Sequence, residues 1–576
     1  MSDNENKEVF KICLTMAGAV SAGAYTAGVM DYMLETLHLW QEAKEKNKKL
    51  GTEHPDYDFS IPMHEVEIDV ISGSSAGGIT GSLVLLNAVD KEHTFVNRDN
   101  HFGKNNRFYQ SWVEMADDEE GGTLDKLLET GDIEPDKKPE SLLNTRAIDL
   151  IADKVMQIKD MKPYPPYISK SLDLVLTTTN LRGINFKIDF HGNDNSSTII
   201  THHGGFFRYK LTNDEYVPGI PVGEDSLYFV LDLYNPRDVK YLKDATLSTA
   251  AFPIGLKSRE ISISQEYVRR YPKYLFGKKK GITAIIEEDA NYLFNSIDGG
   301  LINNEPFGIG VKILKEKNKT DVKADRYAVI MIDPFPNQDH STDKKNPGRD
   351  IFSIGKGMFK ALRNQVLFSQ DGVLDALELS DRTKFLVAPV RKIMFGGEYV
   401  RAKSDLASAP LSGFAGFLDK SFRHHDYHLG RQNCQSFLRY YFAVTDETIA
   451  DRLNSIPHSK AKERFSFSEP KKTVGGAMFF PIIPDVRMLN AFENIVDTEG
   501  HGTDAKLEYP EYPSFDMKVF EKNYKTKIKR RAEVITNRLV NNFWFGIVNR
   551  LIIRRKAYES IQEVIQSELN DADLLK

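Results

Sequence analysis

A serine with the surroundings of a catalytic nucleophile stands early in the chain. Residues 73–77 read Gly-Ser-Ser-Ala-Gly, so Ser75 is the centre of a Gly-x-Ser-x-Gly motif. The apolar run 66–72 precedes the motif and predicts a strand, and the run 79–89 follows it and predicts a helix. A serine on such a turn presents its hydroxyl at the helix N-terminus, where backbone N–H groups and the helix dipole favour a developing negative charge. The motif therefore predicts nucleophilic attack by Ser75.

The two glycines of the motif have a steric role. Residues two positions before and two after the serine must be small, because otherwise the strand and the helix cannot pass closely. Gly73 and Gly77 meet this requirement and form the predicted nucleophile elbow. An ordinary glycine-rich turn is the alternative for so short a motif. Ser74 offers a second hydroxyl, although the spacing favours Ser75.

The serine needs a base, because a hydroxyl is a weak nucleophile until its proton is removed. Asp298, in the stretch Ser-Ile-Asp-Gly-Gly over 296–300, is the strongest candidate. The two glycines after it allow a sharp turn, so that the carboxylate can approach another loop closely. A simple turn aspartate is the alternative interpretation.

A loop of small residues, 17–23, follows an apolar run over 9–16 and precedes a helical pattern over 28–40. Its backbone N–H groups could face the oxygen of a substrate carbonyl. A nucleotide site is the competing interpretation, but the loop contains neither Gly-x-Gly-x-x-Gly nor a Gly-Lys-Ser/Thr ending. We therefore expect no nucleotide cofactor, and no nucleic-acid partner.

Three histidines, His424, His425 and His428, stand close together further along the chain. His424 and His428 would share a helix face at a spacing that metals can use, but no acidic residue takes the general-base position of a zinc-protease motif. The order serine, aspartate, histidine also matches a three-residue hydrolase triad. We favour a structural or pocket-lining role and expect no metal in the catalytic site.

The remaining patterns predict an α/β protein. Two strand-loop-helix units in the first 90 residues indicate a parallel sheet covered by helices. Further strands are predicted over 172–180, 226–234 and 326–334, where β-branched or aromatic runs are bounded by turn residues. Residues 90–165 are polar with helical patches, so we interpret them as an insertion packed on the sheet.

The best boundary between domains is the polar stretch 337–350, which combines charge, Asn, Pro and Gly. It would separate an α/β domain over 8–340 from a mostly helical region over 350–576. Only two cysteines occur, Cys13 and Cys434, and we interpret both as buried thiols in a reducing compartment. The polar N-terminus is unlike a signal peptide and no apolar run is long enough to span a bilayer, so we expect a cytoplasmic protein.

Positive charge is concentrated near the C-terminus. The segment 518–556 holds twelve Lys and Arg against two Glu, a balance of +10 in a chain whose net charge is −6. Such a segment either prefers negative partners or neutralises an acidic face of the protein itself. The apolar stretch 539–553 between basic flanks packs into the protein core or an oligomer, or else binds the surface of an anionic membrane with Trp544 at the boundary.

Three of these segments occur in the order found in patatin-like phospholipases: the loop and helix AGAVSAGAYTAGVMDYML, the GSSAG elbow and the IDGG segment. The small-residue stretch 248–255, STAAFPIG, also looks like the segment that this family has between elbow and aspartate. Three motifs in one order are far more specific than any one of them. The sequence thus resembles a bacterial-type patatin-like protein.

The resemblance implies a three-layer α/β fold and a Ser-Asp dyad without histidine, with Ser75 and Asp298 in those roles. It also implies that Gly18 and Ala19 lie in the loop that binds the oxyanion. Family members usually have three glycines, a basic residue and another glycine there, whereas here no Lys or Arg precedes Gly23. This substitution is where a loss of activity should be sought.

The activity that the resemblance implies is a lipid acyl hydrolase of phospholipase A, lysophospholipase or esterase type. Its substrate would be a phospholipid or another fatty-acyl ester, cleaved through an acyl-enzyme without a cofactor. Peripheral contact with an anionic membrane through the basic tail goes with this function. The alternatives are a catalytically impaired lipid-binding or scaffold protein with the same fold, and an acyltransferase in which an alcohol resolves the acyl-enzyme.

Overall fold

The structure is a computed structural model of the 576-residue chain. It describes the following residues: 9–97, 100–189, 197–211, 228–276, 282–286, 291–304, 306–317, 326–336, 383–468, 478–488, 507–539 and 554–576.

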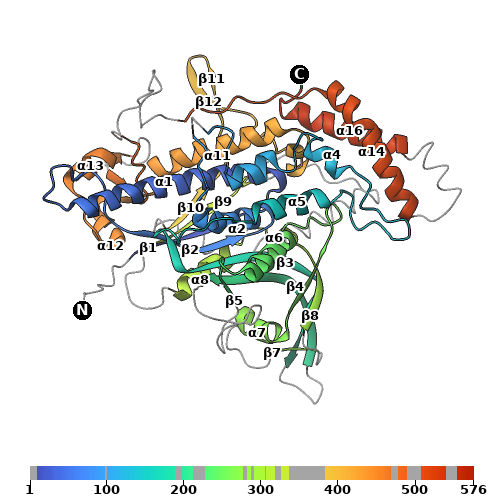
Figure 1. Ribbon diagram of the computed structural model, residues 1–576, viewed down its shortest axis with the longest axis horizontal. Helices are drawn as coiled ribbons and strands as arrows, with labels where there is room; N and C mark the ends of the chain where they lie inside the picture. Colours follow the sequence, from blue (N-terminus) through green and yellow to red (C-terminus); the bar gives the residue numbers. More distant parts are fainter. Residues whose placement is uncertain are drawn as a thin grey trace.

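A sheet of ten strands forms the centre of the protein (Figure 1). The order β10-β9-β1-β2-β3-β4-β5 runs across it, and β6, β7 and β8 pair beside this path. The first five strands of this order, β10 to β3, pair in parallel with one another, whereas β3 pairs antiparallel with β4, β7 and β8. The strands are β1 Phe10–Met16, β2 Val66–Gly73, β3 Ile168–Asp189, β4 Ser197–Leu211, β5 Phe229–Leu231, β6 Arg259–Ser264, β7 Ile282–Ala284, β8 Asn291–Asp298, β9 Tyr327–Ile332 and β10 Lys384–Val387. The mostly parallel sheet that the sequence predicts is confirmed.

Helices cover both faces of the sheet, which gives the predicted three layers. Successive side chains of a strand point to opposite faces, so Met16 and Thr15 of β1 mark the two sides. A Cβ atom added at Gly81 of α2 (Ala76–Val89) would meet Met16, and one added at Gly310 of α8 (Phe307–Lys317) would meet Thr15. The helices α2 and α8 therefore lie on opposite faces.

Two long helices, α1 (Gly23–Leu50) and α11 (Lys420–Tyr440), lie side by side although about 400 residues separate them in sequence (Figure 1). Glycines allow the close approach: a Cβ atom at Gly28 would lie 2.8 Å from the carbonyl carbon of Tyr427. Arg431 of α11 forms ion pairs with Asp31 and Glu35 of α1, all buried. The helix that carries the histidines is thereby fixed to the helix that follows the loop 17–23.

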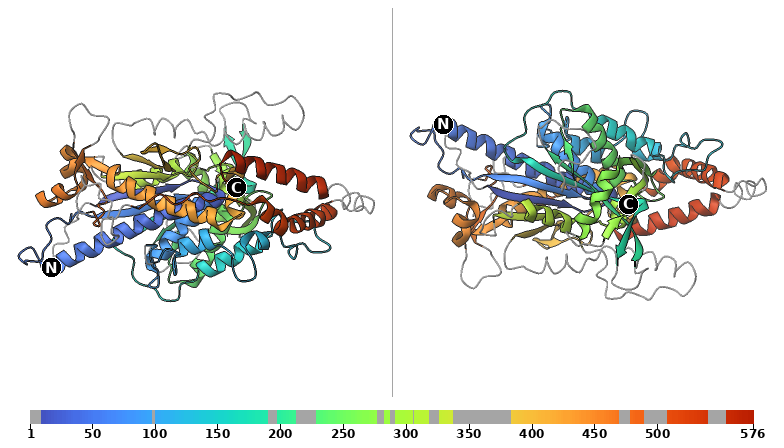
Figure 2. Two further views of the ribbon diagram at one scale, coloured as in Figure 1. Left: turned by 90° about the horizontal axis from the view of Figure 1, so that it is seen from above. Right: turned by 90° about the horizontal axis from the view of Figure 1, so that it is seen from below.

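The region after residue 350 shares the central sheet, because β10 pairs in parallel with β9. The expected boundary at 337–350 lies outside the described residues, as does the segment 540–553 of the tail. The described part of this region is largely helical, as predicted. Its helices α14 (Met517–Leu539) and α16 (Arg554–Asp571) pack together at one end of the molecule (Figure 2).

The tail also has a small core of its own with α11. Phe515, Phe520 and Leu569 are buried there against Phe422. Two cations of α14 bond to the protein body: Lys527 pairs with Asp125 and Arg531 with Asp132. Part of the basic segment therefore neutralises an acidic face of the protein itself, one of the two roles that the sequence left open.

The other elements are short or peripheral. They are α3 Arg107–Tyr109, the π-helix η2 Gln110–Glu114, α4 Thr123–Leu127, α5 Arg146–Val155, α6 Pro236–Thr249, α7 Gln265–Phe276, β11 Lys392–Phe395, β12 Glu398–Arg401, β13 Ala443–Thr445, α12 Ile449–Leu453, α13 Ser459–Phe465, β14 Phe467–Ser468 and β15 Met478–Pro481, with the 3-10 turns η1 Val20–Ala22, η3 Gly299–Leu301, η5 Leu411–Gly413, η6 Ala415–Phe417 and η7 Asp446–Thr448. Cys13 and Cys434 are buried free thiols, as predicted. Among the described helices, none is long and apolar enough to cross a membrane.

Candidate active site

Ser75 stands on a strained turn between β2 and α2. Its backbone has φ 51° and ψ −119°, a conformation that costs free energy for a residue with a side chain and that is found at functional sites. A Cβ atom at Gly73 would lie 2.5 Å from the backbone of Gly77, and one at Gly77 would lie 2.5 Å from the carbonyl carbon of Met16. The structure therefore has the tight elbow that the motif predicts, and both glycines are sterically required.

Asp298 lies at the end of β8 and faces the serine. The Ser75 hydroxyl donates to Oδ2 of Asp298 at 2.6 Å, and both side chains are buried. The other carboxylate oxygen, Oδ1, accepts a hydrogen bond from the N–H of Gly300 at 2.6 Å. This second bond fixes the orientation of the carboxylate, so that one oxygen is aimed at the serine.

Close packing explains why glycine follows the aspartate. A Cβ atom at Gly299 would lie 2.5 Å from the backbone carbonyl of Thr177 on β3. The hydroxyl of Thr179, also on β3, donates a hydrogen bond to the backbone oxygen of Asp298 at 2.9 Å. The carboxylate is therefore held against the central sheet by its own backbone.

The stretch 248–255 forms the third side of the site. The Thr249 hydroxyl accepts a hydrogen bond from the backbone N–H of Ser75 at 3.0 Å. The carbonyl of Ala251 accepts from the N–H of Asp298 at 2.9 Å. This segment at the end of α6 thus contacts both members of the pair and sets the distance between them.

The loop 17–23 reaches the serine through Gly18, and the N–H of Gly18 is already hydrogen-bonded. A Cβ atom at Gly18 would lie 3.1 Å from the Cβ atom of Ser75, so a side chain at this position would crowd the serine. The Gly18 N–H donates to the backbone carbonyl of Asn304 at 3.2 Å, and the Asn304 amide donates back to the Gly18 carbonyl at 3.3 Å. In the part of the chain that the structure describes, the N–H groups of Ala19 and Ala76 have no hydrogen-bond acceptor.

An apolar pocket of about 70 Å³ lies beside Ser75. Ser75 is the polar side chain in its lining, and the rest of the lining comes from five separate parts of the chain. These residues are Val20, Ala76, Ile79, Trp112, Met115, Leu127, Leu143, Ile148, Ala250, Phe252, Leu256, Phe414 and Phe417. Residues 90–165, which the sequence indicated only as an insertion, supply five of them.

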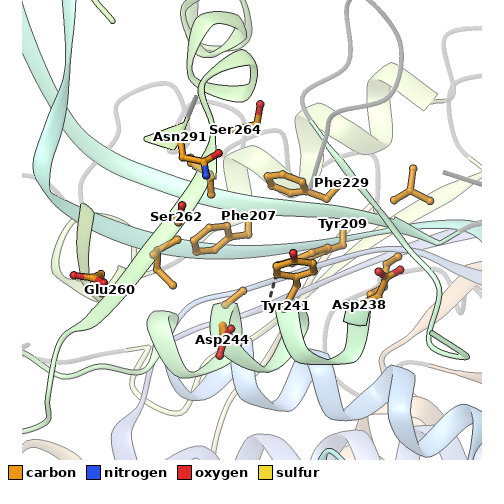
Figure 3. Close-up of a pocket in the computed structure, with 15 residues that line it drawn as sticks. Phe207, Tyr209, Phe229, Asp238, Tyr241, Asp244, Glu260, Ser262, Ser264 and Asn291 are labelled. Carbon is orange, nitrogen blue, oxygen red and sulfur yellow. Dashed lines mark hydrogen bonds between the residues drawn. The ribbon is translucent and has the colours of Figure 1, made fainter. Parts of the chain in front are cut away.

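A larger cavity of about 530 Å³ lies elsewhere, between β4, β5, β6 and α6 (Figure 3). Phe207, Phe229 and Tyr241 are among its aromatic walls. Burial raises the pKa of two acids in its lining, Asp238 and Asp244. The cavity contains neither Ser75 nor Asp298, so its size does not make it the site of the chemistry.

The histidines of α11 belong to another cluster. The His424 Nδ1 atom is 2.7 Å from the Tyr109 hydroxyl, and His425 bonds through Nδ1 to Asp426. His428 stacks on His101, with ring centroids 4.3 Å apart. Burial lowers the pKa of His424 to about 4 and of His428 to about 2, so both imidazoles are neutral at pH 7. These contacts give no support to a triad that includes His424, His425 or His428.

Comparison with protein families agrees with this geometry. The family model described as patatin-like phospholipase matches residues 14–311, a range that includes the elbow, Asp298 and the stretch 248–255. The chain belongs to the patatin-like phospholipase family. This membership places it among lipid acyl hydrolases and confirms the resemblance seen in the sequence.

Two individual proteins are similar to this chain. The uncharacterized protein y4iI of Sinorhizobium fredii is 29% identical, over 93% of this chain and 77% of its own length. The crystal structure of VipD from Legionella pneumophila is 10% identical with a TM-score of 0.19, and the match covers 74% of this chain and 67% of that one. A match with so low a TM-score gives no information about the fold of this chain.

Proposed function

We propose that this patatin-like protein hydrolyses fatty-acyl esters of lipids, with Ser75 as nucleophile and Asp298 as base. One observation carries the proposal: the Ser75 hydroxyl is 2.6 Å from a buried, oriented carboxylate, and Ser75 also lines an apolar pocket. The hydrogen bond from Ser75 to Asp298 activates the nucleophile, because the carboxylate can accept the hydroxyl proton. The pocket would take the start of an acyl chain, because apolar walls favour hydrocarbon over water.

The proposed reaction has two steps. The Ser75 oxygen attacks the carbonyl carbon of the ester while its proton moves to Oδ2 of Asp298. The tetrahedral intermediate collapses as Asp298 returns this proton to the leaving alkoxide, which departs as an alcohol and leaves the acyl chain on Ser75. Water then attacks the acyl-enzyme, with Asp298 again taking and returning a proton, and a free fatty acid is released.

The oxyanion of the intermediate needs N–H donors, and we propose the backbone of Ala19 and of Ala76 for this role. The N–H of Ala76 is at the first position of α2, where no intrahelical acceptor exists. Gly18, whose N–H is bonded to Asn304, would serve by letting the loop approach the serine. Asn304→Ala removes the side-chain amide that donates to the Gly18 carbonyl, and it should lower kcat with little change in KM, since it loosens the loop but not the acyl pocket.

We further propose that the protein docks on anionic lipid surfaces beside this pocket. Leu142 and Ile254 are 50% and 75% exposed and are joined by a backbone hydrogen bond of 2.8 Å. Leu142 adjoins Leu143, and Ile254 stands two residues from Phe252 and from Leu256, all three of which line the pocket. The Leu142 carbonyl accepts a hydrogen bond from Arg531 of α14. An apolar pair next to a basic helix is what interfacial binding to anionic lipid requires.

Charge neutralisation tests the docking surface without removing the tail core. Lys522→Gln together with Arg530→Gln should weaken binding to vesicles that contain an anionic lipid by about 10- to 30-fold at low salt, since each cation contributes about 1 kcal/mol. Hydrolysis of water-soluble esters should be unchanged. The matched control is Lys46→Gln with Lys49→Gln on exposed turns of α1. Equal loss in both double variants, or loss in neither, would remove this surface from the proposal.

Ester hydrolysis by matched variants tests the dyad. The assay uses p-nitrophenyl esters of several chain lengths with wild type, Ser75→Ala, Asp298→Asn and a double variant, His424→Gln with His428→Gln. The dyad predicts loss in the first two variants and retention in the histidine variant. Loss in the histidine variant with folding intact points to a triad. No activity in wild type points to a lipid-binding protein, and ester products with added alcohols point to acyl transfer.

A further inference from the structure

Three histidines converge at a place that the proposed reaction does not use. His101 lies in the loop before α3, and His424 and His428 lie one turn apart on α11. Each offers one ring nitrogen, and these three nitrogens all lie within 4.8 Å of one another. The rings are in contact, with centroids 4.3 Å apart for His101 and His428 and 4.4 Å apart for His424 and His428.

The rings of His424 and His428 are held so that each can offer a ring nitrogen to a metal ion. The Tyr109 hydroxyl, 2.7 Å from Nδ1 of His424, can accept the Nδ1 proton, which leaves the lone pair on Nε2. The Nε2 atom of His428 is buried and has no hydrogen-bond partner among the described residues. A buried polar atom without a hydrogen-bond partner is unfavourable. A bound ligand from outside the chain would relieve this cost at Nε2 of His428.

The third ring is carried by a loop with a defined shape. The Asn100 side chain donates to the backbone carbonyls of Phe95 and Lys104, and its oxygen accepts from the N–H of Lys104. Gly103 has a φ of +60° in the same turn. His101 is itself exposed, so its ring can rotate while the loop backbone stays in place.

We propose that His101, His424 and His428 bind one divalent transition-metal ion of the zinc type. Imidazole nitrogen is a ligand preferred by Zn²⁺, Cu²⁺ and Ni²⁺, whereas Ca²⁺ and Mg²⁺ prefer oxygen. Three protein ligands leave a fourth position open for water or another small ligand. The site is separate from Ser75 and its pocket, and the inference does not depend on the proposed function.

The adjustment needed for binding is small. Zinc–nitrogen bonds of about 2.0–2.1 Å in a tetrahedron place the ligand nitrogens about 3.4 Å apart. The three nitrogens now lie within 4.8 Å, so ring rotations, chiefly of the exposed His101, would close the difference. The alternative is a cluster of stacked imidazoles that binds nothing.

A bound ion would join the loop around residue 101 to α11. The segment that follows this loop includes Tyr109, which contacts His424, and Trp112, which lines the pocket at Ser75. Since the ion binds the folded arrangement and not the unfolded chain, it should raise the midpoint of thermal unfolding.

The test measures Zn²⁺ affinity by competition with a chromogenic chelator on metal-free full-length protein. Wild type should bind one equivalent of Zn²⁺ tightly. His101→Ala, which alters only an exposed loop side chain, should weaken binding by at least about 10- to 100-fold, and Tyr109→Phe should weaken it to a lesser degree through loss of the partner of His424. The control is His54→Ala, which removes an exposed histidine from another loop and should change nothing.

Two further readouts separate ligation from structural damage. Co²⁺ should give wild type the visible absorption of a low-coordinate nitrogen site, and His101→Ala should not show it. Zn²⁺ should raise the thermal midpoint of wild type but not of His101→Ala, while the metal-free midpoints of the two agree. If wild type and His101→Ala bind Zn²⁺ equally, or if wild type binds no equivalent tightly, the proposal is wrong.

Discussion

Replacing Gly299 by alanine should disable the protein while leaving most of its fold intact. The added Cβ atom would lie 2.5 Å from the carbonyl carbon and oxygen of Thr177, and backbone atoms cannot rotate away. Carbon atoms in contact lie about 3.5–4.0 Å apart, so the turn after Asp298 must move by about 1 Å. Such a displacement would lengthen the 2.6 Å bond between Asp298 and Ser75.

The expected magnitudes follow from this movement. A misplacement of about 1 Å in a catalytic group costs about 100-fold in rate. Overpacking of a well-packed core costs about 1–3 kcal/mol in the free energy of unfolding, which leaves a protein of ordinary stability folded. The assay is kcat/KM on a p-nitrophenyl ester, together with urea unfolding of the same preparations.

A second glycine provides the matched control for this substitution. Gly308 lies at the start of α8, is exposed, and has no atom within 4 Å of an added Cβ. Gly308→Ala should therefore keep full activity and unchanged or slightly higher stability. If Gly299→Ala is as active as Gly308→Ala, the packing of the turn does not position Asp298, and this reasoning about the site is refuted.

Two further predictions concern the pocket and the buried charges. Met115→Ala should widen the pocket and shift the preferred p-nitrophenyl ester to a longer chain; an unchanged chain-length profile would mean that this pocket does not hold the acyl group. Burial raises the pKa of Asp485, but Arg487, Arg439 and a hydrogen bond from Tyr32 outweigh it and hold this pKa well below its usual range. A carboxyl with a lowered folded-state pKa stabilises the fold above its unfolded pKa, so this contribution should be full at pH 7 and fall as the pH drops below about 4. Urea unfolding at pH 7 and pH 3.5 should show a smaller loss on acidification for Asp485→Asn than for wild type; equal losses would contradict the assignment.

Local patterns sufficed for the elements that carry the serine and the aspartate. The apolar and β-branched runs at 9–16, 66–72 and 326–334 contain strands of one sheet, because buried parallel strands are continuous apolar segments. Glycine spacing predicted the elbow at Ser75, since the steric demand on such a turn is local in sequence. The glycines after Asp298 made it a candidate base for Ser75, and the family resemblance added support for the pair, but no local pattern specifies a contact across 223 residues.

No sequence pattern pointed to the groups that complete the pocket. Trp112 and Met115 lie in a polar segment, and Phe414 and Phe417 lie in a region expected to be separate from the α/β domain. Each is an ordinary apolar residue whose role depends on distant neighbours. The only local signals would have been apolar residues in otherwise polar loops, which are too common to be specific.

Two other features depend on tertiary contacts for the same reason. The backbone carbonyl of Asn304 occupies the N–H of Gly18, and a backbone contact of this kind leaves no trace in residue types. The i, i+4 spacing of His424 and His428 was visible in the sequence, but the third member, His101, comes from a loop more than 300 residues earlier.

The most direct test of the central claim is to map the site of covalent labelling by a serine-directed fluorophosphonate, using peptide mass spectrometry. The dyad predicts one adduct, on Ser75, in wild type, and none in Ser75→Ala. Asp298→Asn should label more slowly by about 100- to 10,000-fold, the range for loss of a general base. No adduct in folded wild type, an adduct on Ser74, or equal labelling rates for wild type and Asp298→Asn would contradict the account.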